Sequence, residues 1–244
     1  MELTVADAAQ IAGVSLRTVQ RALGNGSLGT ARVLGRQATT DDLAVQAWIR
    51  TTSRGRKWSS RTLEAAIDLL SGGRGESVSS SERSRLRATL REMTARQIAS
   101  SSWIGTWSRY RTFGEVDAQL IGPSIADLSF LGIVAGESWM RFAEVADLDQ
   151  FEANQPVAAD PDGDLVVIER FHDNRGARQL VDIYVLGDAR ESAAAARELE
   201  AAAHCSRDRV RASQCIQTFR QNWVAPSFLG STTAPTTRRR RPKS

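Results

Sequence analysis

Apolar residues follow helical spacing in two short segments at the start of the chain. Val5–Ala12 (VADAAQIA) predicts a helix whose small alanines let a second helix approach closely. Gly13 follows and tolerates the positive φ of a tight turn. Ser15 can cap the next helix, Leu16–Leu23 (LRTVQRAL), because its hydroxyl accepts from a free amide of the first turn. The pattern therefore predicts two helices joined by a short turn.

The spacing within this pair is that of a helix-turn-helix. A small residue (Ala9), a glycine (Gly13) and an inward β-branched anchor (Val19) follow one another at the intervals that the motif requires. The residues expected to face the core are Val14, Val19, Ala22 and Leu23.

A two-stranded wing and a third helix are expected next. Leu34-Gly35-Arg36 is predicted at the tip of a hairpin that carries Arg32 and Arg36 toward a DNA backbone. Thr40-Asp41-Asp42 should begin a helix. Its inner face is expected to hold Leu43, Ala47 and Trp48.

The pattern becomes mixed in the second half. Ser71–Ser81 is rich in glycine and serine and indicates a flexible linker. Ser79 and Glu82 have capping-box spacing and predict a basic amphipathic helix. The apolar residues of that helix are Leu86, Leu90, Met93 and Ile98.

Later segments predict strands and one more helix. Asp160-Pro-Asp-Gly163 indicates a turn, Leu165–Phe171 a strand that leaves it, and Leu180–Leu186 a second strand. Asp188 should cap an alanine-rich helix over 189–203. The expected fold class is α+β, with a mostly helical winged helix-turn-helix followed by a small α+β domain. The expected boundaries are 1–70 for the DNA-binding domain, 71–81 for the linker, 82–203 for an effector or partner-binding domain and 204–244 for a weakly structured to disordered basic tail.

Charge is unevenly distributed along the chain, although the net charge is only +4. Between Arg17 and Arg61 many basic residues are opposed by Asp41 and Asp42 alone, whereas from Glu137 to Asp164 acidic residues dominate. A basic N-terminal segment and an acidic central segment indicate two surfaces with different partners. The alternative is that both are ordinary solvated faces.

The outward side chains of the second predicted helix suit a DNA major groove. Arginine bonds guanine bidentately and glutamine pairs with adenine. We therefore expect Arg17, Gln20 and Arg21 to read bases, Ser15 and Thr18 to orient the helix, and Arg32 and Arg36 to hold phosphates from the wing.

The first 50 residues or so resemble the winged helix-turn-helix of the MerR and excisionase families. The resemblance lies in LTVADAAQIAGVSLRTVQRAL followed by RVLGRQATTDDLAVQAWI. It implies a DNA-binding winged domain and leaves the target open.

A second resemblance extends further along the chain. The segments 54–72, 81–90 and LVDIYVLGDARESAAAARELE look like those of AbiEi-type antitoxins of type IV toxin–antitoxin systems. That resemblance implies repression of an antitoxin–toxin operon and a nucleotidyltransferase-like toxin as partner. The MerR-like N-terminal half departs from that family, and the residues after His204 match nothing in it.

Enzymatic chemistry is not expected. The acidic group Asp160, Asp162, Asp164 and Glu169 flanks turn residues and has no nearby lysine, so it lacks the pattern of a Mg²⁺ nuclease. The chain contains neither a Walker-type phosphate loop nor a G-x-S-x-G elbow. Two cysteines and two histidines form no metal set of known spacing. We therefore predict no catalytic residue, metal or cofactor.

The sequence-based interpretation is thus a transcriptional regulator that binds double-stranded operator DNA, in which autorepression and an antitoxin role are both open. A homodimer on DNA is expected because palindromic operators reward two-fold symmetry. An excisionase-like architectural factor and a ligand-sensing regulator are the alternatives. With neither a signal peptide nor an apolar run long enough for a membrane span, the expected location is the cytoplasm.

Overall fold

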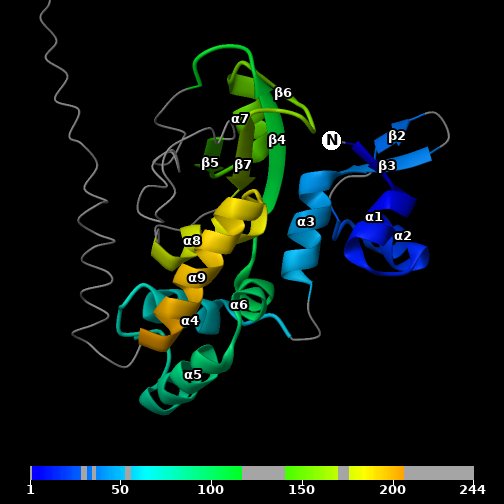
Figure 1. The fold of residues 1–244 in the computed structure, drawn as a ribbon. Helices are drawn as coiled ribbons and strands as arrows, with labels where there is room; N and C mark the ends of the chain where they lie inside the picture. The colour runs from blue at the N-terminus through cyan, green and yellow to red at the C-terminus, as the bar shows by residue number, and fades with distance from the viewer. Residues whose placement is uncertain are drawn as a thin grey trace, which may run out of the picture.

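The N-terminal part of the chain folds as two helices packed beside a three-stranded antiparallel sheet (Figure 1). The computed structural model describes residues 2–28, 32–34, 37–52, 56–116, 141–169 and 176–205. The sheet has the order β1-β3-β2, in which the hairpin pairs Leu34 with Gln37 and Arg32 with Thr39. Its elements are β1 (Glu2–Thr4), α1 (Val5–Ala12), α2 (Leu16–Gly24), β2 (Arg32–Leu34) and β3 (Gln37–Asp41).

Local capping sets both ends of α1. The Thr4 hydroxyl accepts from the Asp7 amide, and the Asp7 carboxylate accepts from the Thr4 amide, which makes a capping box at the start of α1. Gly13 ends α1 in the left-handed region at φ 64°, as the sequence predicts. The amides of Gly13 and Val14 both donate to carbonyls of the last turn of α1.

The first hydrophobic core differs from the expected one at a single position. Val19 is fully buried and Ala22 nearly so, as predicted, but the prediction for Val14 is wrong because its side chain is 37% exposed. The turn that ties the Val14 amide to α1 leaves its side chain at the surface. Leu3 from β1 and Leu28 occupy the core in its place.

The third helix, α3 (Asp42–Thr51), belongs to two hydrophobic cores. Asp41 caps it by accepting from the Leu43 amide at 3.0 Å. Val45 and Trp48 complete the first core, whereas Leu43 and Ala47 pack into the second. The predicted inner residues of this helix are therefore buried, but they face two different neighbours.

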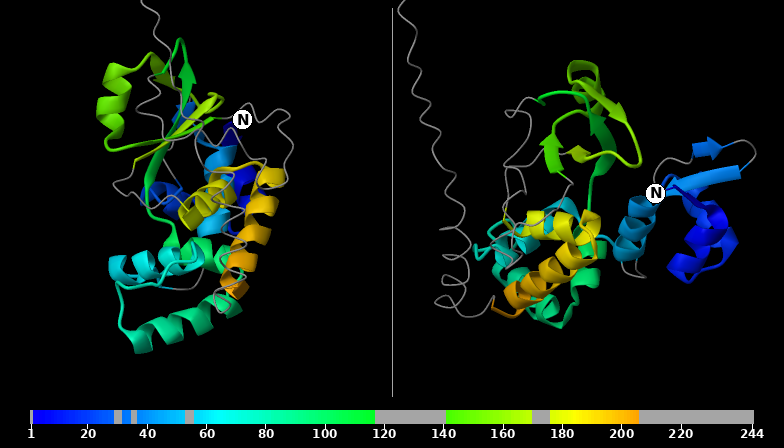
Figure 2. Two further views of the ribbon diagram at one scale, coloured as in Figure 1. Left: turned by 90° about the vertical axis from the view of Figure 1, so that its left-hand side faces the viewer. Right: turned by 45° about the horizontal axis from the view of Figure 1, so that its top comes forward.

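The second core lies among helices gathered around α8 (Figure 2). Within α8 the side chains of Ile183, Val185 and Leu186 are at most 1% exposed. The helices around α8 (Gly176–Leu186) each contribute apolar residues to this core. Besides α3 they are α4 (Ser60–Leu70), α5 (Ser80–Glu92), α6 (Ala95–Ser102) and α9 (Ala189–Cys205).

A mixed four-stranded sheet of order β5-β7-β4-β6 stands against these helices. Its central strand β7 is buried on both faces: Val166 and Ile168 face the helical core, while Leu165 and Val167 face α7. The Phe151 ring of α7 packs edge-on against the Tyr110 ring, with centroids 5.7 Å apart. These elements are β4 (Thr106–Thr112), β5 (Arg141–Val145), α7 (Leu148–Asn154), β6 (Val157–Ala159) and β7 (Leu165–Glu169). The described part of the chain is thus a mixed α+β structure, as predicted.

Two predicted elements are corrected by the structure. The segment 180–186 is not a strand but the second half of α8, and it is buried so extensively that its apolar run has no visible helical period. The amphipathic helix expected to include Met93 and Ile98 is two helices, α5 and α6. A new capping box in which Thr94 pairs with Gln97 separates them.

Other local predictions are confirmed. The turn at 160–163 closes with the Gly163 amide donating to the Asp160 carbonyl, and β7 leaves it. The last two residues of the strand predicted at 165–171 lie outside the described residues. Asp188 accepts from the Glu191 amide at 2.8 Å and begins α9.

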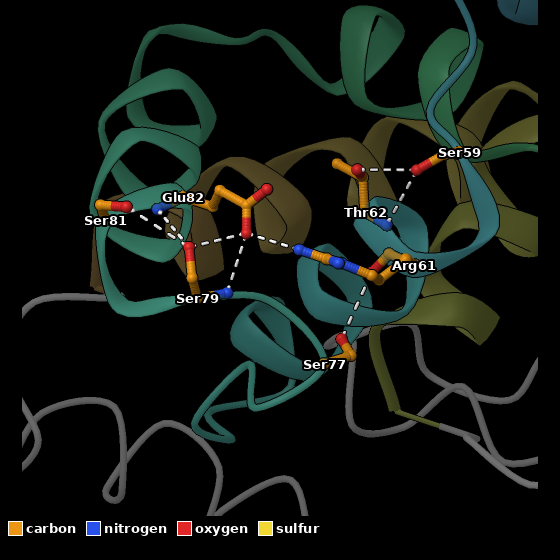
Figure 3. A network of polar contacts seen from close by, with 7 residues as sticks. All are labelled: Ser59, Arg61, Thr62, Ser77, Ser79, Ser81 and Glu82. Carbon is orange, nitrogen blue, oxygen red and sulfur yellow. Dashed lines mark hydrogen bonds and ion pairs between the residues drawn. The ribbon is translucent and has the colours of Figure 1, made fainter.

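The connection between α4 and α5, expected to act as a flexible linker, is held by polar contacts (Figure 3). The Glu82 carboxylate accepts from the Ser79 amide at 2.9 Å and pairs with Arg61 at 2.6 Å. Ser77 donates to the Arg61 carbonyl, and Val78 is buried in the second core. The predicted domain boundary after residue 70 therefore falls inside this core rather than between two cores.

Candidate nucleic-acid interface

The helix α2 presents a polar face to solvent. Its inner side is anchored by Val19, which is completely buried, and by Ala22. The side chains of Arg17, Gln20 and Arg21 are all exposed. Because residues three and four positions apart share one side of a helix, these three lie together, turned away from the core. Their exposure is what is expected of residues that read bases.

The start of α2 is organised by the two hydroxyl residues expected to orient it. The Ser15 hydroxyl accepts from the Thr18 amide at 3.3 Å, and the two hydroxyl oxygens lie 2.9 Å apart. Both side chains remain exposed. The cap fixes the direction in which the first turn of α2 leaves Gly13, and with it the position of Arg17.

The wing is present as the β2–β3 hairpin. Arg32 belongs to β2, where its Cα lies opposite that of Thr39. The pairing of Leu34 with Gln37 leaves Gly35 and Arg36 as the two-residue connection, and both lie outside the described residues. The predicted hairpin is therefore confirmed in its strands, while the predicted phosphate contact of Arg36 stays a prediction.

The candidate reading surface lies at one side of the molecule. In Figure 1 and in the right-hand view of Figure 2, α1, α2 and the wing lie on the opposite side of α3 from α4–α9. The helices of the second core therefore do not stand in front of α2. A long straight ligand such as a duplex could approach α2 along this side.

The charged residues of α2 are all basic. The helix carries Arg17 and Arg21 and no acidic residue, and its N-terminus adds the positive end of the helix dipole. The acidic residue Asp41 stands at the start of α3, with its carboxylate 3.9 Å from Arg109. Burial, aided by a hydrogen bond with Asp42, raises the pKa of Asp41 to about 7.

The carboxylates of the 160–169 region have structural partners. Asp160 accepts from the Arg111 guanidinium at 2.6 Å, and Asp164 accepts from both the amide and the hydroxyl of Thr112. These contacts join the turn to β4. Among the described residues, no group of three or more histidine, cysteine or acidic side chains is arranged to hold a metal ion.

The residues that fix the N-terminal part to the rest of the chain were not predicted from the sequence. The Arg50 guanidinium donates to the carbonyls of Val185 at 2.9 Å and of Gly187 at 2.7 Å, at the C-terminal end of α8. Arg109 is buried and also donates to the Gly163 carbonyl at 2.8 Å. The basic residue in the last turn of α3 was a visible signal for a carbonyl contact, but its partners lie on a distant segment of the chain.

None of the helices in the described part of the chain combines the length and apolar character needed to cross a bilayer.

Comparison with known proteins finds no match. No protein-family model matches the sequence, and neither the curated proteins nor the solved structures contain a match. The geometry of α2 and its wing is therefore what a functional proposal must rest on.

Proposed function

We propose that this chain is a sequence-specific DNA-binding transcriptional regulator that inserts α2 into the major groove of an operator. The observation that carries the proposal is the exposed group Arg17, Gln20 and Arg21 on a short helix whose other side is locked into a core by Val19. Arginine and glutamine offer the paired donors and acceptors that distinguish guanine and adenine in the major groove. In this proposal the β2–β3 hairpin acts as a wing that follows the neighbouring DNA backbone.

In this proposal the chain acts in the cytoplasm as a repressor of its own promoter. Two copies bind one palindromic operator, because symmetry lets the same helix read both half-sites. We call α1, α2 and the β2–β3 hairpin the reading unit, and the elements from α4 to α9 the second unit. The second unit, whose helices pack around α8, then holds the reading unit in a fixed orientation.

The test is fluorescence polarisation with a duplex from the region upstream of the gene and with a scrambled duplex of the same composition. Both are measured at about 50 mM and about 200 mM salt, because phosphate contacts alone weaken steeply over that range. The proposal expects preference for the upstream duplex at both concentrations. Equal binding that disappears at the higher salt on both duplexes would contradict it.

Replacing Arg17 with alanine should relax sequence preference. Loss of a bidentate contact costs about 1–3 kcal/mol of discrimination on the cognate duplex and little on the scrambled one. Arg36→Ala should instead weaken binding to both duplexes and reduce the salt slope by about one.

The matched control for Arg17→Ala is Arg197→Ala on α9, which removes an exposed arginine from a helix of the second unit. It should leave both affinities and the discrimination between duplexes unchanged. If Arg17→Ala discriminates as well as the unmodified chain, α2 is not the reading helix in the orientation proposed.

A further inference from the structure

Large apolar side chains are exposed around the turn between α1 and α2. Ile11 is 47%, Val14 37% and Leu16 47% exposed, whereas the first core is filled by other residues such as Val19 and Leu28. Elsewhere in the described part of the chain, the exposed large apolar residues are Ile104 and Phe113. An otherwise polar reading surface thus has an apolar component at one end.

Leu16 stands at the start of the proposed reading surface. It is the first residue of α2, next to Arg17 and four positions before Gln20, so it lies one helical turn from Gln20 on the same side. Val14 flanks the Ser15 cap on the other side. We call Val14 and Leu16 the apolar edge. The first residues of a helix that enters the major groove are those that reach base edges.

We propose that Leu16, with Val14 beside it, reads the C5-methyl group of a thymine in the operator. This inference rests on the proposed function and specifies one base that it recognises. The composition of this surface favours DNA as the partner. Arg17 and Arg21 attract an anionic partner, and Leu16 packs best against an apolar group within that partner. The thymine methyl is the apolar group of the major groove, and it lies between two rows of phosphates.

A second copy of this chain is a poorer occupant of the same edge. In a two-fold interface each patch meets itself. The edge would then bring Arg17 and Arg21 of one copy close to the same arginines of the other, with no carboxylate on α2 to compensate. DNA supplies the missing negative charge.

The experiment compares the upstream duplex with the same duplex in which every thymine is replaced by deoxyuridine, which removes only the methyl groups. The unmodified chain should bind the uracil duplex about three- to five-fold more weakly per contacted methyl. Leu16→Ala should lose most of this discrimination, because alanine keeps the helix but its side chain is too short for the same contact. Leu16→Met should retain discrimination, since methionine is also a good helix former and fills the same apolar contact.

The matched control is Ile104→Ala, which truncates a side chain of similar exposure, 45%, in the second unit. It should leave the preference for thymine intact. Circular dichroism of each variant reports whether the overall helical content is retained, and sedimentation at the assay concentration reports the oligomeric state.

The outcomes separate this inference from the function on which it rests. Specific binding to the upstream duplex with equal affinity for thymine and uracil would overturn the thymine contact and leave the regulator proposal standing. Absence of any preference over the scrambled duplex would overturn both. Persistent methyl discrimination in Leu16→Ala would assign the contact to another residue. A change of oligomeric state in Leu16→Ala, with discrimination retained, would make the edge a contact between copies.

Discussion

At the scale of single residues, Asp41 joins three parts of the structure. It ends β3, caps α3 through the Leu43 amide, and lies 3.9 Å from the buried guanidinium of Arg109 in β4. Its side chain is only 16% exposed, and burial is the main reason that its pKa rises to about 7. The cap and Arg109 both favour the charged form, but they do not offset the loss of water.

This carboxyl group should make stability fall as pH rises. The folded chain holds the proton more tightly than the unfolded chain, whose pKa is near the ordinary value of 3.8. The contribution is therefore full below about pH 4, declines as pH rises toward about 7, and is absent above that. The neighbouring Asp42, whose pKa is lowered, contributes to stability in the opposite direction. Urea unfolding at a series of pH values between 4 and 8 measures this dependence on pH.

Asp41→Asn should remove this slope while preserving the cap, because the asparagine oxygen still accepts from the Leu43 amide. Asp147→Asn provides the matched control, since Asp147 caps α7 in the same way by accepting from the Gln150 amide. The control should keep the decline between pH 4 and 7. An unchanged slope in Asp41→Asn would show that another group carries it.

At the scale of elements, the Arg50 side chain fastens α3 to the end of α8. The last carbonyls of a helix have no partner within it, and Arg50 donates to those of Val185 and Gly187. Burial lowers the pKa of Arg50, although Tyr184 and Asp188 act in the opposite direction. The contact compensates for part of that lost hydration.

Arg50→Ala should lower the free energy of unfolding by about 1.5–3 kcal/mol, because it leaves partly buried carbonyls without their charged donor. Arg197→Ala, which removes an exposed arginine, should change it by less than about 0.5 kcal/mol. Urea denaturation followed by tryptophan fluorescence compares the two. Equal effects from the two variants would mean that the α3–α8 contact contributes nothing to stability.

Most elements with a local signal were predicted from the sequence, although the capping box at Thr94 was missed, and elements set by distant partners were not predicted. Ser15, Ser79 and Asp188 mark helix starts through residues within four positions, so α2, α5 and α9 were expected where they begin. By contrast, β1 exists because it pairs with β3, and α8 is surrounded by helices that hide its period. The exposed polar face of α2 followed from its spacing, whereas the exposure of Val14 depended on the path of the turn.

At the scale of the whole molecule, the second core joins residues of α3, α4, α5, α6, α8 and α9 with residues of β7. Leu63, Ile67 and Leu70 of α4 are buried in the same cluster as Leu180 and Leu199. A helix whose apolar face has lost its partners is marginal in water at this length. The predicted unit 1–70 therefore contains α4, whose packing partners in α8 and α9 lie far along the chain.

A fragment of residues 1–70 should keep α1 and α2 but lose α4. We expect rapid amide exchange across 60–70 in the fragment and slow exchange there in the full chain, measured by hydrogen–deuterium exchange mass spectrometry. A fragment of residues 1–205 retains every described helix and serves as the control. Equal protection of α4 in both fragments would show that it needs neither α8 nor α9.

The sharing of α3 determines how freely this sequence can vary. Val45 and Leu43 are two positions apart, yet a change in side-chain volume at Val45 affects the first core and one at Leu43 affects the helices around α8. The packing constraint on each of these two positions therefore comes from a different core. A volume change at either one must be compensated by residues of its own core. A chimera that takes its N-terminal part from another protein would keep both cores only if the α3 residues of each core came from the same parent as the rest of that core. A cut in a loop would divide one of the two cores.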